Sequence, residues 1–363
     1  MKPRLAIMSR YDRLGASSRL RQLQFVETCR AAGLQVEVMS YFDDAYLTDL
    51  YAGRIRPRDI LRYFLRRCGD FAPARRADVV WLEKEALPWV PWGLERLMLG
   101  AVPIVSDFDD AVFHRYDMHR SRIVRWLLGR KIDKLMASST IVFAGNDYLA
   151  ARARAAGARR VEIIPTVVDV EAYGIAQEHH GGLPRIGWIG TPGTWRAFGV
   201  PMMAMLRDVM SRGAAEFHAV GAAKPEHPIP GFTFHDWSEE TEVARIQQMD
   251  IGIMPLPDSP WARGKCGYKL IQYMACGLPV VASPVGVNRQ IVEHGVNGFL
   301  AETDDEWREA LATLVADPDL RRRMGAAGRK KVEADYSLQV YGPKVAAMLR
   351  DVAQAGRRQR ALR

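Results

Sequence analysis

The chain has 363 residues, 48% of them apolar, and a formal net charge of +9. One hydrophobic core rarely extends beyond about 250–300 residues, so this length favours two domains. The four scattered cysteines (Cys29, Cys68, Cys266 and Cys276) have neither disulfide nor zinc-site spacing, and the first residues lack the apolar stretch of a signal peptide, which predicts a protein of the reducing cytoplasm. No run of about 18 apolar residues is present, which excludes a transmembrane helix.

The first 40 residues predict a strand, a loop, a helix and a second strand. Leu5 to Met8 is apolar, a helix follows the loop and extends to about Ala32, where Gly33 ends it, and Val36 to Met39 is again strand-like. This order makes a βαβ unit and therefore a parallel sheet. The loop contains Gly15 and the candidate anion or acceptor contacts Ser17, Ser18 and Arg19; the alternative is an ordinary turn and helix cap.

Arginine is concentrated in two helical stretches of the first half. Between Arg54 and Arg76 there are eight arginines, and Arg58, Arg62 and Arg66 recur every four residues beside the apolar residues Ile60, Leu61, Phe64 and Leu65. Residues 120–136 form a second basic stretch that includes Trp126. These patterns favour an anionic membrane surface, with a solvated arginine face as the alternative. Nucleic acid is disfavoured, because no base-stacking motif accompanies the arginines.

A carboxylate-rich segment follows one of the next predicted strands. Residues 79–82 and 103–106 are expected to be strands with a helix at 94–99 between them, and Asp107, Asp109, Asp110 and His114 come directly after the second strand. Ligands of open α/β sheets bind beyond the carboxyl ends of the strands, so these acids are candidate functional groups. Helix N-capping by Asp107 or Asp110 is the alternative.

The alternation of strands and helices restarts after a polar, glycine-containing segment. Strands are predicted at 141–144 and 161–165, a linker at 178–184, and further strands at 185–190, 217–221, 232–237 and 250–256. The second half therefore predicts another parallel sheet. Its loops carry Gly190, Thr191 and Arg196 after the first strand and Trp237 after the third.

Residues 263–286 combine a glycine-containing loop, a short helix and a buried strand. Tyr268 to Cys276 has helix formers throughout, Gly277 and Pro279 end that helix, and Val280 to Ala282 is strand-like. A loop that leads into a helix N-terminus presents free N–H groups and a partial positive charge, which suit a phosphate. Gly264 and Gly267 permit close backbone approach, and Lys265 and Lys269 add full charges.

The end of this stretch, Met-Ala-Cys-Gly-Leu-Pro-Val-Val-Ala-Ser at 274–283, resembles the donor-binding signature of the family 4 glycosyltransferases, which are retaining enzymes of the GT-B fold. Their pattern is Glu, seven residues, Glu, followed by Ala-x-Gly-x-Pro-Val-Val-Ala-Ser. Gly264 and Gln272 stand where that family has its two acids. Residues 164–169 and 293–300 also resemble family segments, so the resemblance is firm over 185–336 and looser before it.

The resemblance implies an α/β protein of GT-B architecture, with two Rossmann-like parallel-sheet domains facing each other across a cleft. Residues 1–177 would form the acceptor domain, with a C-terminal helix at 337–363 packing back on it, and residues 178–336 would form the donor domain. The implied reaction moves a sugar from a nucleotide-diphosphate sugar to an acceptor, with retention of configuration. No metal or other cofactor is expected.

The resemblance also implies roles for individual residues. Asp109 and Asp110 fall nearest the positions of the catalytic centre, and Ser18, Arg19 and His114 are candidate acceptor or anion contacts. The implied donor-binding residues are Gly15, Gly190, Thr191, Arg196, Trp237, Lys265, Gly267, Tyr268, Lys269 and Gln272. The expected partners are a nucleotide-sugar, a lipid-linked or cell-surface glycan and an anionic membrane surface, with the protein cytoplasmic or peripheral on the inner face of the plasma membrane.

A second hypothesis follows from the two missing acids. A chain with Gly264 and Gln272 at those positions is also compatible with a catalytically silent nucleotide-sugar binder, or with a partner subunit of an active transferase. Measured turnover distinguishes the two hypotheses.

Overall fold

The computed structural model describes residues 2–176, 182–211 and 215–361, and the predicted domain boundary between residues 177 and 178 lies outside them, as do residues 178–181 of the predicted linker. The chain falls into two compact units. The first contains Met1–Thr166, Arg263–Cys266 and Tyr341–Arg363, and the second contains Val167–Ala262 and Gly267–Val340. Each unit is described by itself below.

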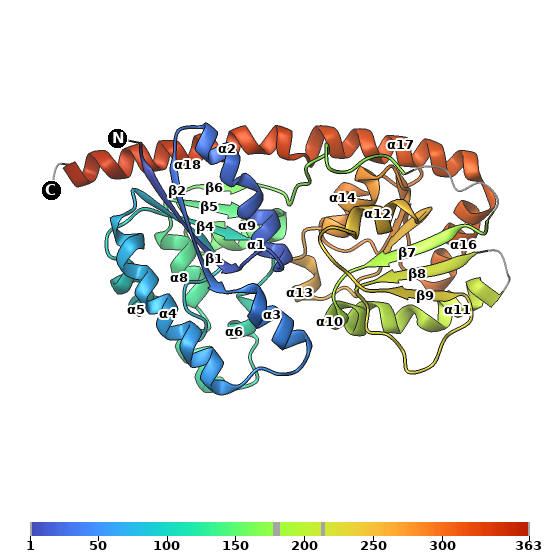
Figure 1. Cartoon of the computed structure of the whole chain (residues 1–363), viewed down its shortest axis with the longest axis horizontal. Helices are drawn as coiled ribbons and strands as arrows, with labels where there is room; N and C mark the ends of the chain where they lie inside the picture. Colours follow the sequence, from blue (N-terminus) through green and yellow to red (C-terminus); the bar gives the residue numbers. More distant parts are fainter. Residues whose placement is uncertain (1, 177–181, 212–214, 362–363) are drawn as a thin grey trace. The chain divides into compact units, whose positions relative to one another are not determined.

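A parallel sheet with the strand order β2-β1-β3-β4-β5-β6 forms the centre of the described part of the first unit (Figure 1). Its strands are β1 (Arg4–Tyr11), β2 (Gln35–Phe42), β3 (Val79–Glu83), β4 (Ile104–Phe108), β5 (Ile141–Ala144) and β6 (Val161–Ile163). β3, β4 and β5 are buried along their whole length. Such continuous apolar runs are typical of strands that are covered on both faces, and the predicted parallel sheet is confirmed.

Helices cover both faces of this sheet. They are α1 (Ala16–Arg21), the 3₁₀ turn η1 (Leu23–Phe25), α2 (Val26–Ala31), α3 (Asp44–Tyr51), α4 (Pro57–Arg76), α5 (Trp92–Leu99), α6 (His114–Asp117), α7 (Arg122–Leu128), α8 (Lys131–Ser138) and α9 (Asp147–Ala155). On one face Ala6 and Met8 of β1 share a core with α4, α5, α8 and α9. On the other face the ring of Phe25 packs edge-on against Trp81 of β3.

The last helix of the chain, α18 (Leu338–Ala361), contributes residues 341–361 to the first unit. A Cβ atom at Gly356 would lie 2.3 Å from the carbonyl oxygen of Asp78, so only glycine permits this close approach. Arg360 donates hydrogen bonds to the carbonyl oxygens of Arg76 and Ala77. α18 is therefore part of the first unit's packing.

The second unit has its own parallel sheet, with the order β12-β11-β10-β7-β8-β9 among its described strands. These are β7 (Arg185–Ile189), β8 (Glu216–Val220), β9 (Phe232–His235), β10 (Ile251–Met254), β11 (Val280–Ala282) and β12 (Gly298–Leu300). Counted from its own first strand, this is the 3-2-1-4-5-6 order of dinucleotide-binding domains, read from the other edge. Both predicted sheets, and with them the two Rossmann-like folds, are present.

The helices of the second unit also lie on both faces of its sheet (Figure 1). They are α10 (Pro192–Thr194), the π turn η2 (Trp195–Gly199), the 3₁₀ turn η3 (Val200–Met202), α11 (Met203–Ser211), α12 (Glu242–Gln247), α13 (Pro260–Arg263, whose last residue belongs to the first unit), α14 (Tyr268–Ala275), α15 (Asn288–Ile291), α16 (Asp304–Ala316) and α17 (Pro318–Asp335). Ile251 and Ile253 of β10 share a core with α11 and α16. Gly252 lies between them, and a Cβ atom there would be 2.2 Å from the Tyr273 ring of α14 on the opposite face.

Two helical predictions need correction. The basic stretch at 120–136 is two helices, because a Cβ atom at Gly129 would lie 2.2 Å from the carbonyl oxygen of Arg125, and α7 ends there before α8 begins. The basic face of α4 is also not a free surface throughout. Arg67 is 1% exposed and donates to the carbonyl oxygens of Met39 and Ser9, and burial lowers its pKa to about 10.

Among the described helices, none combines the length and the apolar composition that a membrane-crossing segment requires.

Candidate functional site

The first unit brings its candidate residues together at a topological switch point. β1 connects to β2 on one side of the sheet and β3 connects to β4 on the other, so the connections that leave the carboxyl ends of β1 and β3 diverge, and open α/β sheets bind ligands at such points. Ser17 and Ser18 follow β1, Glu83 ends β3 and is followed by Lys84, and Asp109 follows β4. The predicted acids and the predicted serine loop are therefore neighbours.

Lys84 is the centre of this group, although no sequence motif marks it. Its ammonium Nζ lies 2.8 Å from Asp109 Oδ1, 3.9 Å from Asp110 Oδ2 and 3.7 Å from Glu83 Oε1. It also donates a hydrogen bond of 2.8 Å to Ser17 Oγ. Its φ angle of 58° is uncommon for a residue other than glycine, and strained backbone of this kind clusters at functional sites.

Asp109 is held in its ionised form. Burial on its own would raise the pKa of Asp109, but Lys84 and Arg21, together with hydrogen bonds from Lys84 and Ser17, lower it to about 2. Its side chain keeps 14% of its surface exposed. Asp109 is therefore a negative charge at neutral pH that an incoming ligand could still reach.

Asp107 has a different environment, although it lies only two residues away. It is 1% exposed, and its Oδ1 accepts hydrogen bonds of 2.9 and 2.7 Å from Nε and Nη2 of Arg21. Trp81 Nε1 donates to its other oxygen at 3.1 Å. Burial raises the pKa of Asp107 to about 6 against the opposing charge of Arg21. Asp107 lies inside β4 and is not a helix N-cap, and its contacts join Arg21 of α1 to Trp81 of β3.

Asp110 and Lys265 form a pair within the first unit. Lys265 Nζ lies 3.0 Å from Asp110 Oδ1, and Asn146 Nδ2 donates to the Lys265 carbonyl oxygen at 2.9 Å. Gly264 packs on the same loop, where a Cβ atom would lie only 2.5 Å from Cβ of Ala111. The packing of the protein, rather than a ligand, therefore requires glycine at 264. The predicted contact of Lys265 with a diphosphate stays a prediction.

The predicted acceptor contacts already have partners inside the first unit. Ser18 Oγ donates to Glu83 Oε2 at 2.5 Å and accepts the N–H of Tyr11 at 2.8 Å, and its side chain is fully buried. Both ring nitrogens of His114 are engaged, Nδ1 with Asp117 at 2.9 Å and Nε2 with the Tyr148 hydroxyl at 2.8 Å.

The other two candidates of this loop, Arg19 and Gly15, are also held by contacts within the first unit. Arg19 is 6% exposed and donates to the Arg13 carbonyl oxygen at 3.3 Å. Gly15, the N-cap position of α1, is buried, and a Cβ atom there would lie 2.2 Å from Cβ of Tyr11. Of the residues named for this loop, Ser17 is the one placed directly on the Lys84 and Asp109 group.

The second unit has a corresponding switch point between β7 and β10. Gly190 follows β7, and Gly221, at φ 72°, comes so close that a Cβ atom on it would lie 2.2 Å from the Gly190 carbonyl oxygen. Thr191 is the N-cap of α10, where its hydroxyl accepts the N–H of Thr194 at 3.3 Å. Arg196 lies on η2 and is exposed. This close backbone approach therefore requires glycine at 221, whereas a Cβ atom at Gly190 would lie 2.6 Å from the Trp188 ring. Arg196 is placed where it can meet an anion.

The helix α14 starts as predicted, directly after a glycine. Gly267 is its N-cap at φ 67°, a backbone conformation that favours glycine, and a Cβ atom there would also lie 2.2 Å from Ile291 Cδ1. Lys269 is the second residue of the helix, and its Nζ lies 5.3 Å from the centre of the Trp188 ring. A helix N-terminus with a lysine beside it is suited to a phosphate. The predicted strand at 280–282, which follows the helix, is confirmed.

Three of the predicted donor-binding residues share one hydrogen-bond network. Gln272 Nε2 donates to the Tyr173 hydroxyl at 2.9 Å, and that hydroxyl lies 3.1 Å from the Tyr268 hydroxyl. Glu242 accepts from the Tyr173 hydroxyl at 3.2 Å and from Trp237 Nε1 at 2.9 Å.

The sequence analysis did not identify Tyr173 or Glu242, because neither belongs to a recognisable motif. The available signal was a glutamate on the helix after Trp237, on the side that faces the core. Glu242 is linked through the Tyr173 hydroxyl to Gln272, the position at which the family signature has an acid.

Within residues 2–176, 182–211 and 215–361, no group of three or more His, Cys, Asp or Glu side chains has an arrangement suited to a metal ion.

Comparisons with known proteins agree with the fold and the signature. Residues 184–317 match the family model "Glycosyl transferases group 1". A sucrose-phosphate synthase from Thermosynechococcus elongatus has the same fold, with a TM-score of 0.74, 14% identity and coverage of 98% of this chain and 100% of that one. Anabaena HepE, solved in complex with UDP, gives a TM-score of 0.69 at 15% identity and covers 96% of this chain and 99% of that one.

Curated relatives match over shorter stretches. D-inositol 3-phosphate glycosyltransferase of Thermobispora bispora is 30% identical over 123 residues, which are 33% of this chain and 25% of that protein. Human alpha-1,3/1,6-mannosyltransferase ALG2 is 36% identical over 70 residues, 19% of this chain and 16% of that protein. The chain thus spans about a quarter or less of the length of these two relatives. Residues 184–317 therefore match the glycosyl transferases group 1 family, and the chain has the GT-B fold that the signature at 274–283 predicted.

Proposed function

We propose that the protein is a retaining glycosyltransferase that moves a sugar from a nucleotide-diphosphate sugar to an acceptor hydroxyl. The observation that carries the proposal is the β7/β10 switch point in the matched family segment, where Gly190, Lys269 and the N-terminus of α14 meet the requirements of a diphosphate. HepE, a protein of the same fold, has been solved with UDP and with UDP-glucose.

In this proposal the second unit binds the donor. The N-terminus of α14 and the Lys269 ammonium attract the diphosphate, whose negative charge grows as its bond to the sugar breaks. Arg196, exposed on η2, supplies a second cation. Gln272, Tyr268 and Trp237 lie on the Tyr173 and Glu242 network, which provides polar groups for the ribose and the base.

The first unit supplies the catalytic charge. The bond between the anomeric carbon and the diphosphate oxygen breaks, the acceptor oxygen bonds to that carbon, and the acceptor proton passes to the departing phosphate. Positive charge develops on the sugar during this exchange. We assign Asp109 to stabilising that charge and Asp110, paired with Lys265, to orienting the reacting groups, without a metal ion.

The proposal is tested first by ligand binding and then by turnover. A thermal-shift screen of UDP, GDP and their sugars should give a stabilisation that is larger for one of the two bases, since a ligand that binds only the folded protein raises its stability. Transfer or donor hydrolysis should follow with that nucleotide-sugar, and NMR of the product should show the anomeric configuration of the donor. Absence of any nucleotide-dependent shift would contradict the proposal.

Replacement of Lys269 by methionine should weaken nucleotide binding about ten- to a hundredfold. The reason is that a hydrogen bond to a charged group contributes about 1.5–3 kcal/mol, and about 1.4 kcal/mol corresponds to a factor of ten. Calorimetry on the folded variant measures the change. Lys224→Met is the matched control, because Lys224 belongs to the same unit and pairs with Asp236 at an exposed site. Equal affinity of Lys269→Met and wild type would place the phosphates elsewhere, with Arg196 as the next position to test.

A catalytically silent nucleotide-sugar binder, or a partner subunit of an active transferase, is the second candidate. This candidate is favoured because both acids of the family signature are replaced. Packing requires the glycine at 264, and the amide of Gln272 donates to Tyr173. This candidate expects the same nucleotide-dependent thermal shift with no turnover, whereas transfer by the purified chain removes it.

For the acceptor we propose a lipid-linked or cell-surface glycan, used by a cytoplasmic protein that binds peripherally to the inner face of the plasma membrane. The net charge of +9 and the two arginine-rich stretches support an anionic surface as a partner, and nucleic acid is not expected to bind.

A further inference from the structure

The helix α7 presents an apolar face that the fold does not cover. Trp126 is 85% exposed, Ile123 is 74% exposed and Leu127 is 51% exposed, while Leu128 on the other side of the helix is buried in the core of the first unit. The helix therefore has one face that holds it to the protein and another that offers large apolar side chains to its surroundings. Contiguous apolar surface of this kind marks an interaction site.

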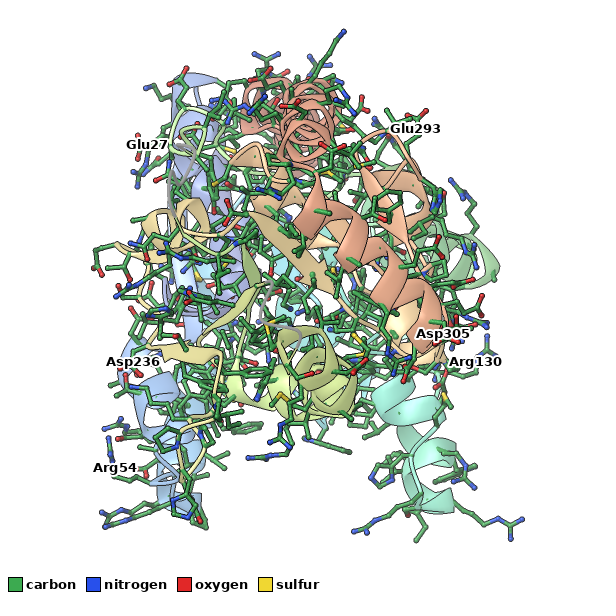
Figure 2. All side chains as sticks on the ribbon, turned by 90° about the vertical axis from the view of Figure 1, so that its right-hand side faces the viewer. Glu27, Arg54, Arg130, Asp236, Glu293 and Asp305 are labelled. Atoms are coloured by element: carbon green, nitrogen blue, oxygen red, sulfur yellow. The ribbon has the colours of Figure 1, made fainter. Side chains whose placement is uncertain are left out.

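The position of α7 makes this face accessible to an extended surface. Figure 2 shows the helix projecting from the first unit, with Arg130 at its base on the outside of the ribbon. The segment that carries Arg54 projects towards the same edge of the view as a separate extension of the same unit. A flat partner approaching the first unit from this side would meet both extensions.

The charge around the apolar face is positive. Arg120, Arg122, Arg130 and Lys134 are exposed. The nearby acids Asp117 and Asp133 both pair with Arg152, at 3.1 and 2.7 Å, which offsets one of their two negative charges and leaves the four cations in excess. Tryptophan at the centre of an apolar face, with arginine around it, is the combination found at the interface between lipid head groups and acyl chains.

We infer that α7 is a membrane-inserting element: Ile123, Trp126 and Leu127 enter the interfacial layer of an anionic bilayer, while the surrounding cations contact the lipid phosphates. The inference rests on the proposed function only in the choice of a membrane-linked acceptor, and it deepens that proposal by naming the contact. On α4, Arg67 is buried and Arg66 donates to the carbonyl oxygens of Ser40 and Tyr41 at 3.0 and 2.9 Å, so α4 offers a membrane fewer free cations than its sequence suggests.

The experiment uses the full chain and vesicles of phosphatidylcholine with and without phosphatidylglycerol. Wild type should sediment with the anionic vesicles, its tryptophan emission should shift to the blue, and binding should weaken as salt rises. Trp126→Ser should lower the affinity about tenfold, and the double variant Ile123→Ser with Trp126→Ser should lower it further. Leu97→Ser is the matched control, because Leu97 is an apolar side chain on α5 of the same unit and is 70% exposed.

The outcomes separate this inference from the proposed function. Equal vesicle binding by wild type and Trp126→Ser would overturn the inference. It would also be overturned if wild type forms a dimer that has no affinity for vesicles and that dissociates when Trp126 is replaced, because the apolar face would then bind a second copy of the chain. Transfer to a soluble acceptor by Trp126→Ser at the wild-type rate is expected, because the helix does not touch the catalytic residues. Vesicle binding without any transfer by wild type would contradict the proposed function and leave the inference intact.

Discussion

Replacement of Asp109 by asparagine is expected to lower the rate of sugar transfer about a hundred- to a thousandfold, the usual effect of removing one group that stabilises transition-state charge. Asparagine keeps the shape of the side chain and removes its negative charge. Lys84, whose Nζ lies 2.8 Å from Asp109, then retains only the more distant carboxylates of Glu83 and Asp110. Rate constants at saturating donor, measured on protein whose fold has been checked by circular dichroism, test the prediction.

Two controls separate catalysis from folding. Asp49→Asn removes a carboxylate of the same unit that is 48% exposed and paired with Arg54, and it should leave the rate unchanged. Lys84→Met removes the partner of Asp109, so the pKa of Asp109 should rise towards its ordinary range and the rate should fall as well. An Asp109→Asn protein that folds and transfers sugar at the wild-type rate would exclude Asp109 from catalysis.

The pH dependence follows from the sign of the Asp109 shift. Its pKa in the folded protein, about 2, is below the ordinary value, so the stabilisation from its charge is present above the unfolded pKa of about 3.9 and is lost as pH falls towards 2. Between pH 5 and 8 Asp109 stays ionised. An acid limb in the rate profile of wild type within that range must therefore come from another group, and Lys84→Met should show an additional limb at higher pH than wild type does.

Replacement of Lys131 by methionine is expected to destabilise the protein by about 3–5 kcal/mol, because removing one partner of a buried ion pair leaves an uncompensated charge. Lys131 is fully buried, and its Nζ lies 2.7 Å from Glu85 Oε2 and 2.7 Å from Glu95 Oε1. It also donates to the Leu87 carbonyl oxygen at 2.6 Å. Urea unfolding followed by circular dichroism measures the loss.

The matched control is Lys134→Met, one turn further along α8 at an exposed position, where a change within about 0.5 kcal/mol is expected. The effect of Lys131→Met should also depend on pH. Burial raises the pKa of Glu95 to about 7 despite Lys131, so Glu95 lowers the stability of the folded state as pH rises from its unfolded pKa through 7. Without Lys131 this loss of stability should be larger, so the free energy of unfolding of the variant should be closest to that of wild type at low pH. A uniform loss from pH 5 to 8 would contradict this account.

The sequence predicted the sheets better than the surroundings of the side chains. Two of the predicted strands, β11 at Val280–Ala282 and β3 at Val79–Glu83, are short and mainly apolar runs bounded by turn residues. Strands of this kind can be predicted from the local sequence pattern alone. The stripe of arginines on α4 looked uniform in sequence. Whether an arginine on it reaches solvent or a buried carbonyl, as Arg67 does, depends on β2 and β1, which are distant in the chain.

The candidate site was predicted in part for the same reason. Asp109 follows a strand end, which a pattern shows, and the structure gives it a strongly lowered pKa. Lys84 follows β3 with no motif around it, and its importance comes from Asp109 and Asp110, which follow another strand, together with its neighbour Glu83. Spacing in the sequence does not encode such a meeting. The same holds for Tyr173 and Glu242, which lie 69 residues apart and meet through one hydrogen bond.

The docking of α18 on the first unit has a consequence for biosynthesis. The first unit consists of Met1–Thr166, Arg263–Cys266 and Tyr341–Arg363, so its final helix leaves the ribosome after every residue of the second unit. Domains generally fold as units in the order of their synthesis. In the nascent first unit, the surface around Asp78 and Pro103 that receives Gly356 therefore stays uncovered until residues 341–361 have been synthesised. All residues of the second unit are therefore synthesised before the first unit is complete. A ribosome stalled before residue 341 would hold an incomplete first unit that chaperones must protect.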